Sequence, residues 1–457
     1  MSRTTSISIK TYLEQPLYSA ALAVFRLAFG IMLFGGVIRF WLRGWIEELY
    51  IRPHFYFHYY GFEWIKPLGN GAYLLFAVCA ISALFFAVGL FYRLSATVLF
   101  LSFTWIELLD KTNYLNHYYF VSLALFLMIW LPAQANLSLD AWQRPTLYKR
   151  YLPRWTIGSI RLMLGIVYIY AGLAKLNSDW LVQAMPLRLW LPAKNDLPLV
   201  GPLLNKEWVA YAFSWFGAVY DLTVPFFLLN RSTRPFAFAT VIVFHVATSI
   251  LFPIGMFPYI MILSTLIFFD SRDIDTIVKK CEHLFTKLPA ATGSDMFTFA
   301  PPWRRVVPAL FAMFFVIQLL LPWRYLLLPG ELFWTEEGYR FSWRVMLMEK
   351  TGYAQFVVRD GATGRQVGVN NTDFLTANQE KMMATQPDLL LQYAHMLRDH
   401  YRQQGMQDPK VYATVYVTLN GRRSRLLTDT SVDLAAEKDG FFHKKWITDQ
   451  QYKIYGL

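Results

Sequence analysis

The sequence predicts a polytopic α-helical membrane protein with about 8–9 transmembrane helices and a small extracytoplasmic α+β domain at its C-terminal end. Of its 457 residues, 55% are hydrophobic and 18% are aromatic, a combination that is unusual for a soluble protein. Several apolar runs reach the ~20 residues that span a bilayer. The composition becomes ordinary and polar after about residue 330. We therefore divide the chain into a helical transmembrane domain, 1–330, and a soluble α+β domain with β-hairpins, 331–457.

The transmembrane domain contains nine apolar segments, whose ends are uncertain by a few residues. The third is short, and the seventh and eighth are nearly continuous, which gives a count of eight or nine. The segments are 19–42, 71–92, 95–109, 114–132, 157–176, 208–230, 235–252, 254–269 and 306–328. Between the first two, the stretch 50–69 is aromatic but broken by Pro and Gly, so we expect a loop at the outer headgroup boundary.

The orientation follows from the distribution of Lys and Arg. With nine spans the termini lie on opposite sides, and a cytoplasmic N-terminus places the basic loops 143–154, 231–234 and 270–305 inside. The C-terminal domain then lies outside. The net charge of +12 is typical of loops that face lipid headgroups, so the lipid bilayer is the expected partner. The sequence has no nucleic-acid recognition motif, and nucleic acid is not an expected partner.

The C-terminal domain has its own secondary-structure signals. Residues 353–369 alternate in hydropathy around an Asp-Gly turn and predict a hairpin. Residues 372–405 have the period of a helix. Residues 411–428 predict a second hairpin that turns at Asn420-Gly421.

The cysteines do not indicate a disulfide or a metal centre. Cys79 lies in an apolar run and Cys281 in a charged loop, so the two are not expected to meet. The sequence has no CxxC motif and no His/Cys cluster, and no metal is expected.

Ionisable residues inside the spans are costly, and they indicate function unless they are paired. The set consists of Arg26, Glu107, Asp110, His117, Arg161, Lys175, Asp221 and His245. For Arg26, Glu107, Arg161 and Asp221 the expected role is a structural ion pair between helices. The sequence does not assign their partners.

Other polar residues gather in the outer half of the predicted bundle. The fourth span begins with Asn116 and His117, and the fifth ends at Lys175. The seventh places His245 at mid-depth, with Ser249 one turn above it on the same face. A break rich in Pro and Gly follows, and irregular backbone at this depth must be buried in protein or line a cavity. These positions predict a polar-lined pocket that opens outward or sideways.

Lys175 permits two interpretations. One is a snorkelling lysine whose ammonium lies at the membrane edge. The other is a base: the preceding turns are apolar and aromatic, burial disfavours an ammonium, and a neutral amine is a competent general base. His117 likewise fits either a hydrogen-bonding residue near a helix end or a catalytic group.

Four motifs resemble the vitamin K-dependent gamma-carboxylase family and its bacterial relatives, in the family's order. They are LLDKTNYLNHYY at 108–119, AGLAKLNSDW at 171–180, FHVATSILFPIGMFPY at 244–259 and FSWRVMLMEK at 341–350. The resemblance covers most of residues 19–360. It implies an integral protein of a bacterial inner membrane, since the chain lacks a likely disulfide.

The resemblance also implies a reaction. A reduced vitamin K, which is a hydroquinone, is deprotonated and reacts with O2. The basic product removes a γ-proton from a glutamyl side chain, which takes up CO2 to give γ-carboxyglutamate, and quinone epoxide remains. No metal is used. In this scheme Lys175 is the base that deprotonates the quinol, and His117 lies beside the reacting quinone. The implied quinone-binding residues are Asn116, Tyr118, His245, Ser249 and Met256.

The chain departs from the vertebrate pattern at two points. Position 174 is Ala, where vertebrate members have a second lysine, and the outer domain is much shorter than theirs. The short domain leaves the carboxyl acceptor open, although a glutamate-containing peptide or protein is the candidate partner. Two alternatives therefore remain: a quinol epoxidase without carboxylation, and a quinone- or lipid-binding membrane protein without catalysis.

Overall fold

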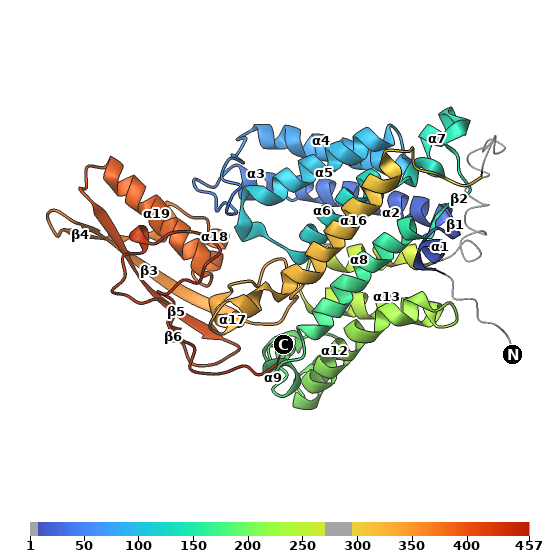
Figure 1. Ribbon diagram of the computed structural model, residues 1–457. Coiled ribbons are helices and arrows are strands. Elements are labelled where there is room, and N and C mark those ends of the chain that lie inside the picture. The colour runs from blue at the N-terminus through green and yellow to red at the C-terminus, as the bar shows by residue number, and fades with distance from the viewer. Residues whose placement is uncertain (1–7, 270–294, 457) are drawn as a thin grey trace.

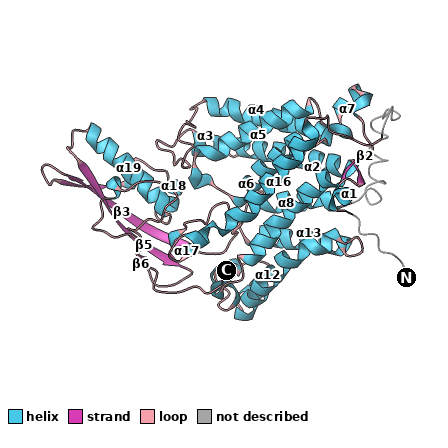
Figure 2. Cartoon of the chain, viewed as in Figure 1, coloured by secondary structure: helices cyan, strands magenta, loops and turns pink. Residues whose placement is uncertain are grey.

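A computed structural model describes residues 8–269 and 295–456. Figure 1 shows a helical bundle joined to a smaller α+β domain, and the helix α1 (Ile9–Leu13) lies at the end of the bundle away from that domain. Figure 2 shows that the main strands belong to the small domain. Cys281 and part of the basic loop 270–305 lie outside the described residues.

Every one of the nine expected apolar segments contains a helix. In chain order they are α2 (Ala20–Leu42), α4 (Gly71–Val88), α5 (Tyr92–Leu109), α6 (Asn116–Trp130), α8 (Arg154–Leu173), α12 (Glu207–Leu229), α13 (Arg234–Leu251), α14 (Phe257–Thr265) and α16 (Trp303–Leu320). Seven of them, counting α16 with its extension to Leu327, are long and apolar enough to cross a membrane. The helices α6 and α14, the latter extended to Phe268, are shorter and apolar. The structure therefore confirms a polytopic helical protein.

Small residues allow the bundle helices to approach closely. A Cβ atom added to Gly30 in α2 would lie 2.7 Å from the Cβ atom of Ala87 near the end of α4. One added to Gly172 in α8 would lie 2.7 Å from Leu222 in α12. Because lipid tails are as apolar as the helices, close packing of this kind is a main force that holds helices together in a membrane.

Short elements join the helices at both ends of the bundle. The end that carries the soluble domain has α3 (Trp45–Tyr50), η1 (Lys111–Asn113), α9 (Ser178–Leu181), α10 (Leu187–Trp190), η4 (Pro192–Lys194) and α11 (Gly201–Leu204). The other end has α1 (Ile9–Leu13), β1 (Pro16–Tyr18), η2 (Ala133–Ala135), α7 (Leu139–Gln143), η3 (Pro145–Leu147) and β2 (Tyr151–Pro153). There β1 and β2 pair antiparallel.

The soluble domain is an antiparallel sheet in the order β4-β3-β5-β6, with helices packed on one face (Figure 2). The helix η6 (Leu321–Leu327) continues α16 toward this domain. The elements of the domain are α17 (Leu332–Thr335), β3 (Lys350–Asp360), β4 (Gln366–Val369), η7 (Asn371–Asp373), α18 (Ala377–Met383), α19 (Pro387–Gln403), β5 (Pro409–Leu419), β6 (Arg425–Leu426) and η8 (Leu434–Ala436). Both expected hairpins are present. The second turns through Asn420 and Gly421 with φ of 49° and 69°, as a type I′ turn requires.

The single helical stretch expected at 372–405 is instead two helices. Pro387 is the first residue of α19, a position that proline favours because its missing N–H is not needed there. Leu389, Leu390 and Leu397 of α19 are fully buried against the sheet.

The soluble domain shares its core with the bundle end. Its buried residues form one cluster with Phe57 of the aromatic loop, Trp180 of α9 and Leu251 of α13. The loop 50–69 therefore packs under the domain. The remaining bundle helices form a separate core.

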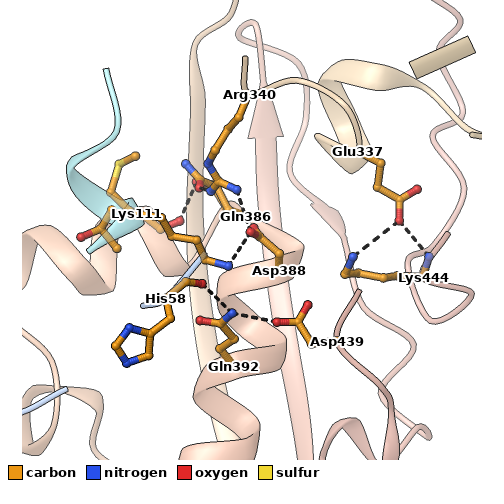
Figure 3. A network of polar contacts seen from close by, with 12 residues as sticks. His58, Lys111, Glu337, Arg340, Gln386, Asp388, Gln392, Asp439 and Lys444 are labelled. Carbon is orange, nitrogen blue, oxygen red and sulfur yellow. Dashed lines mark hydrogen bonds and ion pairs between the residues drawn. The ribbon is translucent and has the colours of Figure 1, made fainter. Parts of the chain in front are cut away.

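A polar network links the same two parts, as Figure 3 shows. The carboxylate of Asp388 lies 2.7 Å from Lys111 Nζ and 2.6 Å from Arg340 Nη1. Nearby, Gln392 donates to the carbonyl of His58 at 2.9 Å. Burial alone raises the pKa of Asp388, but Arg340 and Lys111 outweigh burial and hold the pKa well below its usual range.

Candidate functional site

Lys175 points into the protein. Helix α8 ends at Leu173, and the next turn directs the Lys175 ammonium to Asp221 of α12, with Nζ 2.6 Å from Oδ2. The ammonium also donates to the carbonyl of Ala171 at 3.2 Å and lies 5.4 Å from the ring centroid of Trp180. Both charged side chains are 8% exposed. This is not the geometry of a lysine that snorkels to the headgroups.

Lys175 and Asp221 line a cavity that we call the Lys175 cavity. The space between its lining residues, including the part open to the outside, is about 750 Å³. Its walls come from α8, α9, α10, α12, α13, α14 and the stretch Val345–Met346. The lining is rich in aromatic rings: Tyr168, Trp180, Trp190, Phe213, Phe244, Phe252 and Phe257. The result is an apolar chamber with a charged pair in its wall.

His245 also lines this cavity, but Ser249 does not. The Nδ1 atom of His245 lies 2.9 Å from the carbonyl oxygen of Val241, so Nδ1 donates and Nε2 is left as an acceptor. The residue of α13 that joins His245 in the lining is Thr248. The Ser249 hydroxyl donates to the carbonyl of Val246 at 2.7 Å.

His117 lies behind the wall of the Lys175 cavity. It is 7% exposed, and its Nε2 atom is buried without a hydrogen-bond partner within the described chain. The ring of Phe257 separates it from His245, with centroid distances of 5.9 Å to His117 and 5.6 Å to His245. Asn116, which precedes His117, donates to the carbonyl of Arg344 at 2.8 Å. The candidate pair Asn116–His117 is therefore next to the cavity but separated from it by one aromatic side chain.

Tyr118 and Met256 face a different cavity, which we call the Glu107 cavity. It encloses about 560 Å³ between α2, α4, α5, α6 and α14. Helix α14 divides the two cavities: Met256 before its first turn and Ile260 line the Glu107 cavity, whereas Phe257 and Met261 line the Lys175 cavity. Of the predicted quinone-binding residues, His245 thus lines the Lys175 cavity, Tyr118 and Met256 line the Glu107 cavity, and Asn116 and Ser249 line neither.

The other charged residues of the spans have different partners. The expectation of a structural ion pair is wrong for Arg26, which is fully buried and donates to backbone carbonyls of residues 87, 133, 136 and 137. Arg161 donates to the carbonyl of Ile267 at 2.9 Å. Asp221 is paired, and its partner is the candidate base Lys175.

The soluble domain also holds the segment around Lys175, which no local sequence pattern indicates. Asp179, which is 1% exposed, accepts hydrogen bonds of 2.6 Å from both Nη atoms of Arg422 and one of 2.7 Å from Asn420. Beside it, the amide of Ser178 donates to the carbonyl of Tyr455 at 2.7 Å. Arg422 lies 243 positions beyond Asp179, and no local pattern connects them.

The soluble domain holds the His117 segment as well. The amide of Phe341 donates to the Tyr114 hydroxyl at 2.9 Å, and Asn116 binds the Arg344 carbonyl. Asp110, just before this segment, accepts a 2.7 Å hydrogen bond from Gln379. Both candidate segments therefore reach their positions through contacts with the C-terminal domain.

The fold and these cavities define a polytopic membrane protein with buried polar groups that face apolar chambers and with a soluble domain docked over them. Two family models match the chain: the HTTM domain over residues 14–272, and the vitamin K-dependent gamma-carboxylase, lumenal domain, over residues 303–453. The chain belongs to the vitamin K-dependent gamma-carboxylase family. It is an integral membrane protein with an extracytoplasmic domain. No solved structure matches it.

Proposed function

We propose that this protein couples the O2-dependent epoxidation of a reduced naphthoquinone to the γ-carboxylation of glutamyl side chains. Membership of the family supports vitamin K-dependent carboxylation at the level of the family. The observation that carries the finer proposal is the position of Lys175, whose amine faces an aromatic cavity at 2.6 Å from Asp221.

The Lys175 cavity suits a reduced naphthoquinone, which is a flat apolar ring with a hydroxyl at each end. Its walls are aromatic, and its acceptors are the Asp221 carboxylate and Nε2 of His245. Such groups accept the hydrogen bonds of a hydroxyl-bearing ligand. When bound, the hydroquinone would be the group that reacts with O2. The apolar lining excludes water, which would quench a strong base.

Lys175 and Asp221 act as a unit in this proposal. The pair has two forms of equal total charge: an ammonium beside a carboxylate, and an amine beside a carboxylic acid. The second form places no ionised groups in a dry cavity, where they are costly, and leaves the nitrogen lone pair free. In this form Lys175 accepts a hydroxyl proton from the ligand, and Asp221 positions the amine.

His117 and Asn116 are proposed to act from the other side of Phe257. The unpartnered Nε2 of His117 is available to a ligand that moves this ring, because a buried polar atom gains free energy from any hydrogen bond it makes. Asn116 is already bound to Arg344 and is proposed to hold the helix end rather than the ligand. His245 is a quinone-binding residue, and Ser249 supports its helix.

The remaining assignments concern orientation and acceptor. We further propose that the N-terminus lies in the cytoplasm and that the membrane is a bacterial inner membrane. The support is the extracytoplasmic C-terminal domain together with the nine apolar helices of residues 8–269 and 295–456, which is an odd number. A glutamate-containing peptide is the proposed acceptor. Among the described strands, β4 is paired on one side only, and such an edge can bind an extended peptide.

A quinone- or lipid-binding protein without turnover is the second candidate. The observation in its favour is the ion pair itself, because an ammonium held by a carboxylate at 2.6 Å donates protons and does not accept them.

The test is a turnover assay on the purified protein with reduced vitamin K, O2 and labelled bicarbonate, with and without a glutamate-containing peptide. Epoxide together with label in the peptide is the expected result. Epoxide without label would show a quinol epoxidase that does not carboxylate this acceptor. Bound quinol without epoxide would favour the second candidate.

A further inference from the structure

The Glu107 cavity contains three polar side chains that nothing in the proposed reaction uses. They are Glu107 of α5, Tyr118 of α6 and Tyr50 of α3. Within residues 8–269 and 295–456, neither the Glu107 carboxyl nor the hydroxyls of Tyr118 and Tyr50 make a hydrogen bond or ion pair. A polar group inside a membrane protein without a partner indicates a ligand site.

The rest of the lining is apolar and rich in aromatic rings. Phe40, Phe76 and Phe103 face the cavity from three helices, and Met256 faces it from the start of α14. The cavity therefore suits a ring-shaped apolar ligand with one or two polar atoms.

The protonation state of the Glu107 carboxyl determines whether the ligand must bring hydrogen-bond donors or acceptors. A carboxyl in an apolar cavity without a cation beside it is most stable as the neutral acid, which donates an O–H. The hydroxyls of Tyr118 and Tyr50 are further donors. A ligand that satisfies these groups must bring acceptors. A lipid acyl chain brings none, and an amine would bring further donors.

We propose that the Glu107 cavity is a second quinone site, which binds the oxidised form. A quinone has a carbonyl acceptor at each end of its ring and no donor, so it matches a cavity that offers donors. The Lys175 cavity presents an acceptor in either form of its pair, the Asp221 carboxylate or the Lys175 amine, beside Nε2 of His245, and so matches the hydroxyl donors of the reduced form. This inference rests on the proposed function, since it assigns a second site to the same class of ligand.

The geometry relates the two sites through one helix. Met256 and Ile260 face the Glu107 cavity, and Phe257 and Met261 face the Lys175 cavity. The wall between a reduced and an oxidised ligand would therefore be the single helix α14. Ligands in the two cavities would therefore contact side chains that are neighbours in the sequence at the start of α14.

The experiment uses the full chain in lipid nanodiscs and an oxidised naphthoquinone that carries a photoreactive azide. After illumination, labelled peptides are identified by mass spectrometry. The expected label appears on peptides that contain residues 103–121 or 32–40. Glu107→Leu keeps the volume but removes the donor, so half-saturation of this label should need about tenfold more probe, the effect of one buried hydrogen bond. Glu107→Gln keeps an N–H donor and should stay within about threefold of wild type.

Lys175→Ala is the matched variant for the other site and should leave the label on 103–121 unchanged. If Glu107→Leu does not fold, Tyr118→Phe replaces it, with a weakening of about fivefold expected. Label on 103–121 that neither Glu107→Leu nor Tyr118→Phe weakens would overturn the inference. So would label confined to the Lys175 cavity, although the proposed function would then stand. Label at the Glu107 cavity without epoxide in the turnover assay would leave the inference and remove the proposed function.

Discussion

The hydrogen bonds between Arg422 and Asp179 predict how strongly the soluble domain holds the Lys175 segment. Asp179 is 1% exposed. Its carboxylate accepts hydrogen bonds from the Arg422 guanidinium and thereby raises the pKa of that group. Arg422→Gln removes the charge and both 2.6 Å hydrogen bonds. The matched control is Arg423→Gln, because Arg423 is the exposed next residue on the same turn.

The magnitude follows from the burial of the carboxylate. Removing one partner of a buried ion pair costs about 3–5 kcal/mol. Arg422 is 17% exposed and Asn420 remains bound to Asp179, so we expect about 3 kcal/mol, at the lower limit of that range. This corresponds to a change of about 150-fold in the docked population.

Hydrogen exchange measures this docking directly. The amide of Ser178 donates to the carbonyl of Tyr455 in the soluble domain, so it is protected only while the segment is held. Arg422→Gln should reduce its protection by about 150-fold, and Arg423→Gln should not change it. Adding Asp179→Asn to Arg422→Gln should restore part of the protection, since no buried charge then lacks a partner. Equal protection in wild type and Arg422→Gln would refute the reasoning.

Three further predictions test the remaining contacts. Asp388→Asn should lower the stability of the docked domain by about 3 kcal/mol because it leaves the cations Lys111 and Arg340 without their carboxylate. In the wild type the pKa of Asp388 is depressed, so this stability should be present above about pH 4 and be lost as the pH falls further. Thermal unfolding measured across pH checks both statements. Asp221→Asn should lower the epoxidation rate by about 100-fold with little change in KM, because it misplaces the Lys175 amine without closing the cavity; an unchanged rate would remove Asp221 from the mechanism. Deletion of 335–457 should abolish epoxidation as well as carboxylation, because the deleted domain holds both candidate segments. Retained epoxidation in the truncated protein would contradict this.

The fold was largely predictable because its signals are local. Apolar runs of bilayer length identified the helices of the bundle, and alternation with an Asn-Gly turn identified the second hairpin. The structure differs from the expected helix boundaries where Gly and Pro residues interrupt an apolar or periodic stretch. The eighth segment becomes helical only at Phe257, since Gly255 has a φ of +61° and Pro253 precedes it. Pro387 divides one expected helix into two.

The site was only partly predictable because its contacts are distant in sequence. Local chemistry selected Lys175 and His245, which meet in one cavity. Periodicity could not choose between Thr248 and Ser249, because positions three and four residues from His245 lie on the same helix face. Nor could it show that Phe257 stands in front of His117, or that Asp221 is the partner of Lys175 across 46 positions. Such pairings depend on tertiary packing.

The role of Lys175 as the base is the central claim, and amine rescue of Lys175→Ala tests it most directly. Epoxide formation from reduced vitamin K and O2 is measured in the wild type, in Lys175→Ala, and in Lys206→Ala, which removes an exposed lysine at the start of α12. We expect Lys175→Ala to lose at least ~100-fold in rate, to regain part of it when small primary amines are added, and to bind quinol as before, while Lys206→Ala remains at the wild-type rate. Undiminished epoxidation by Lys175→Ala would show that the lysine has only a structural role in its pair with Asp221.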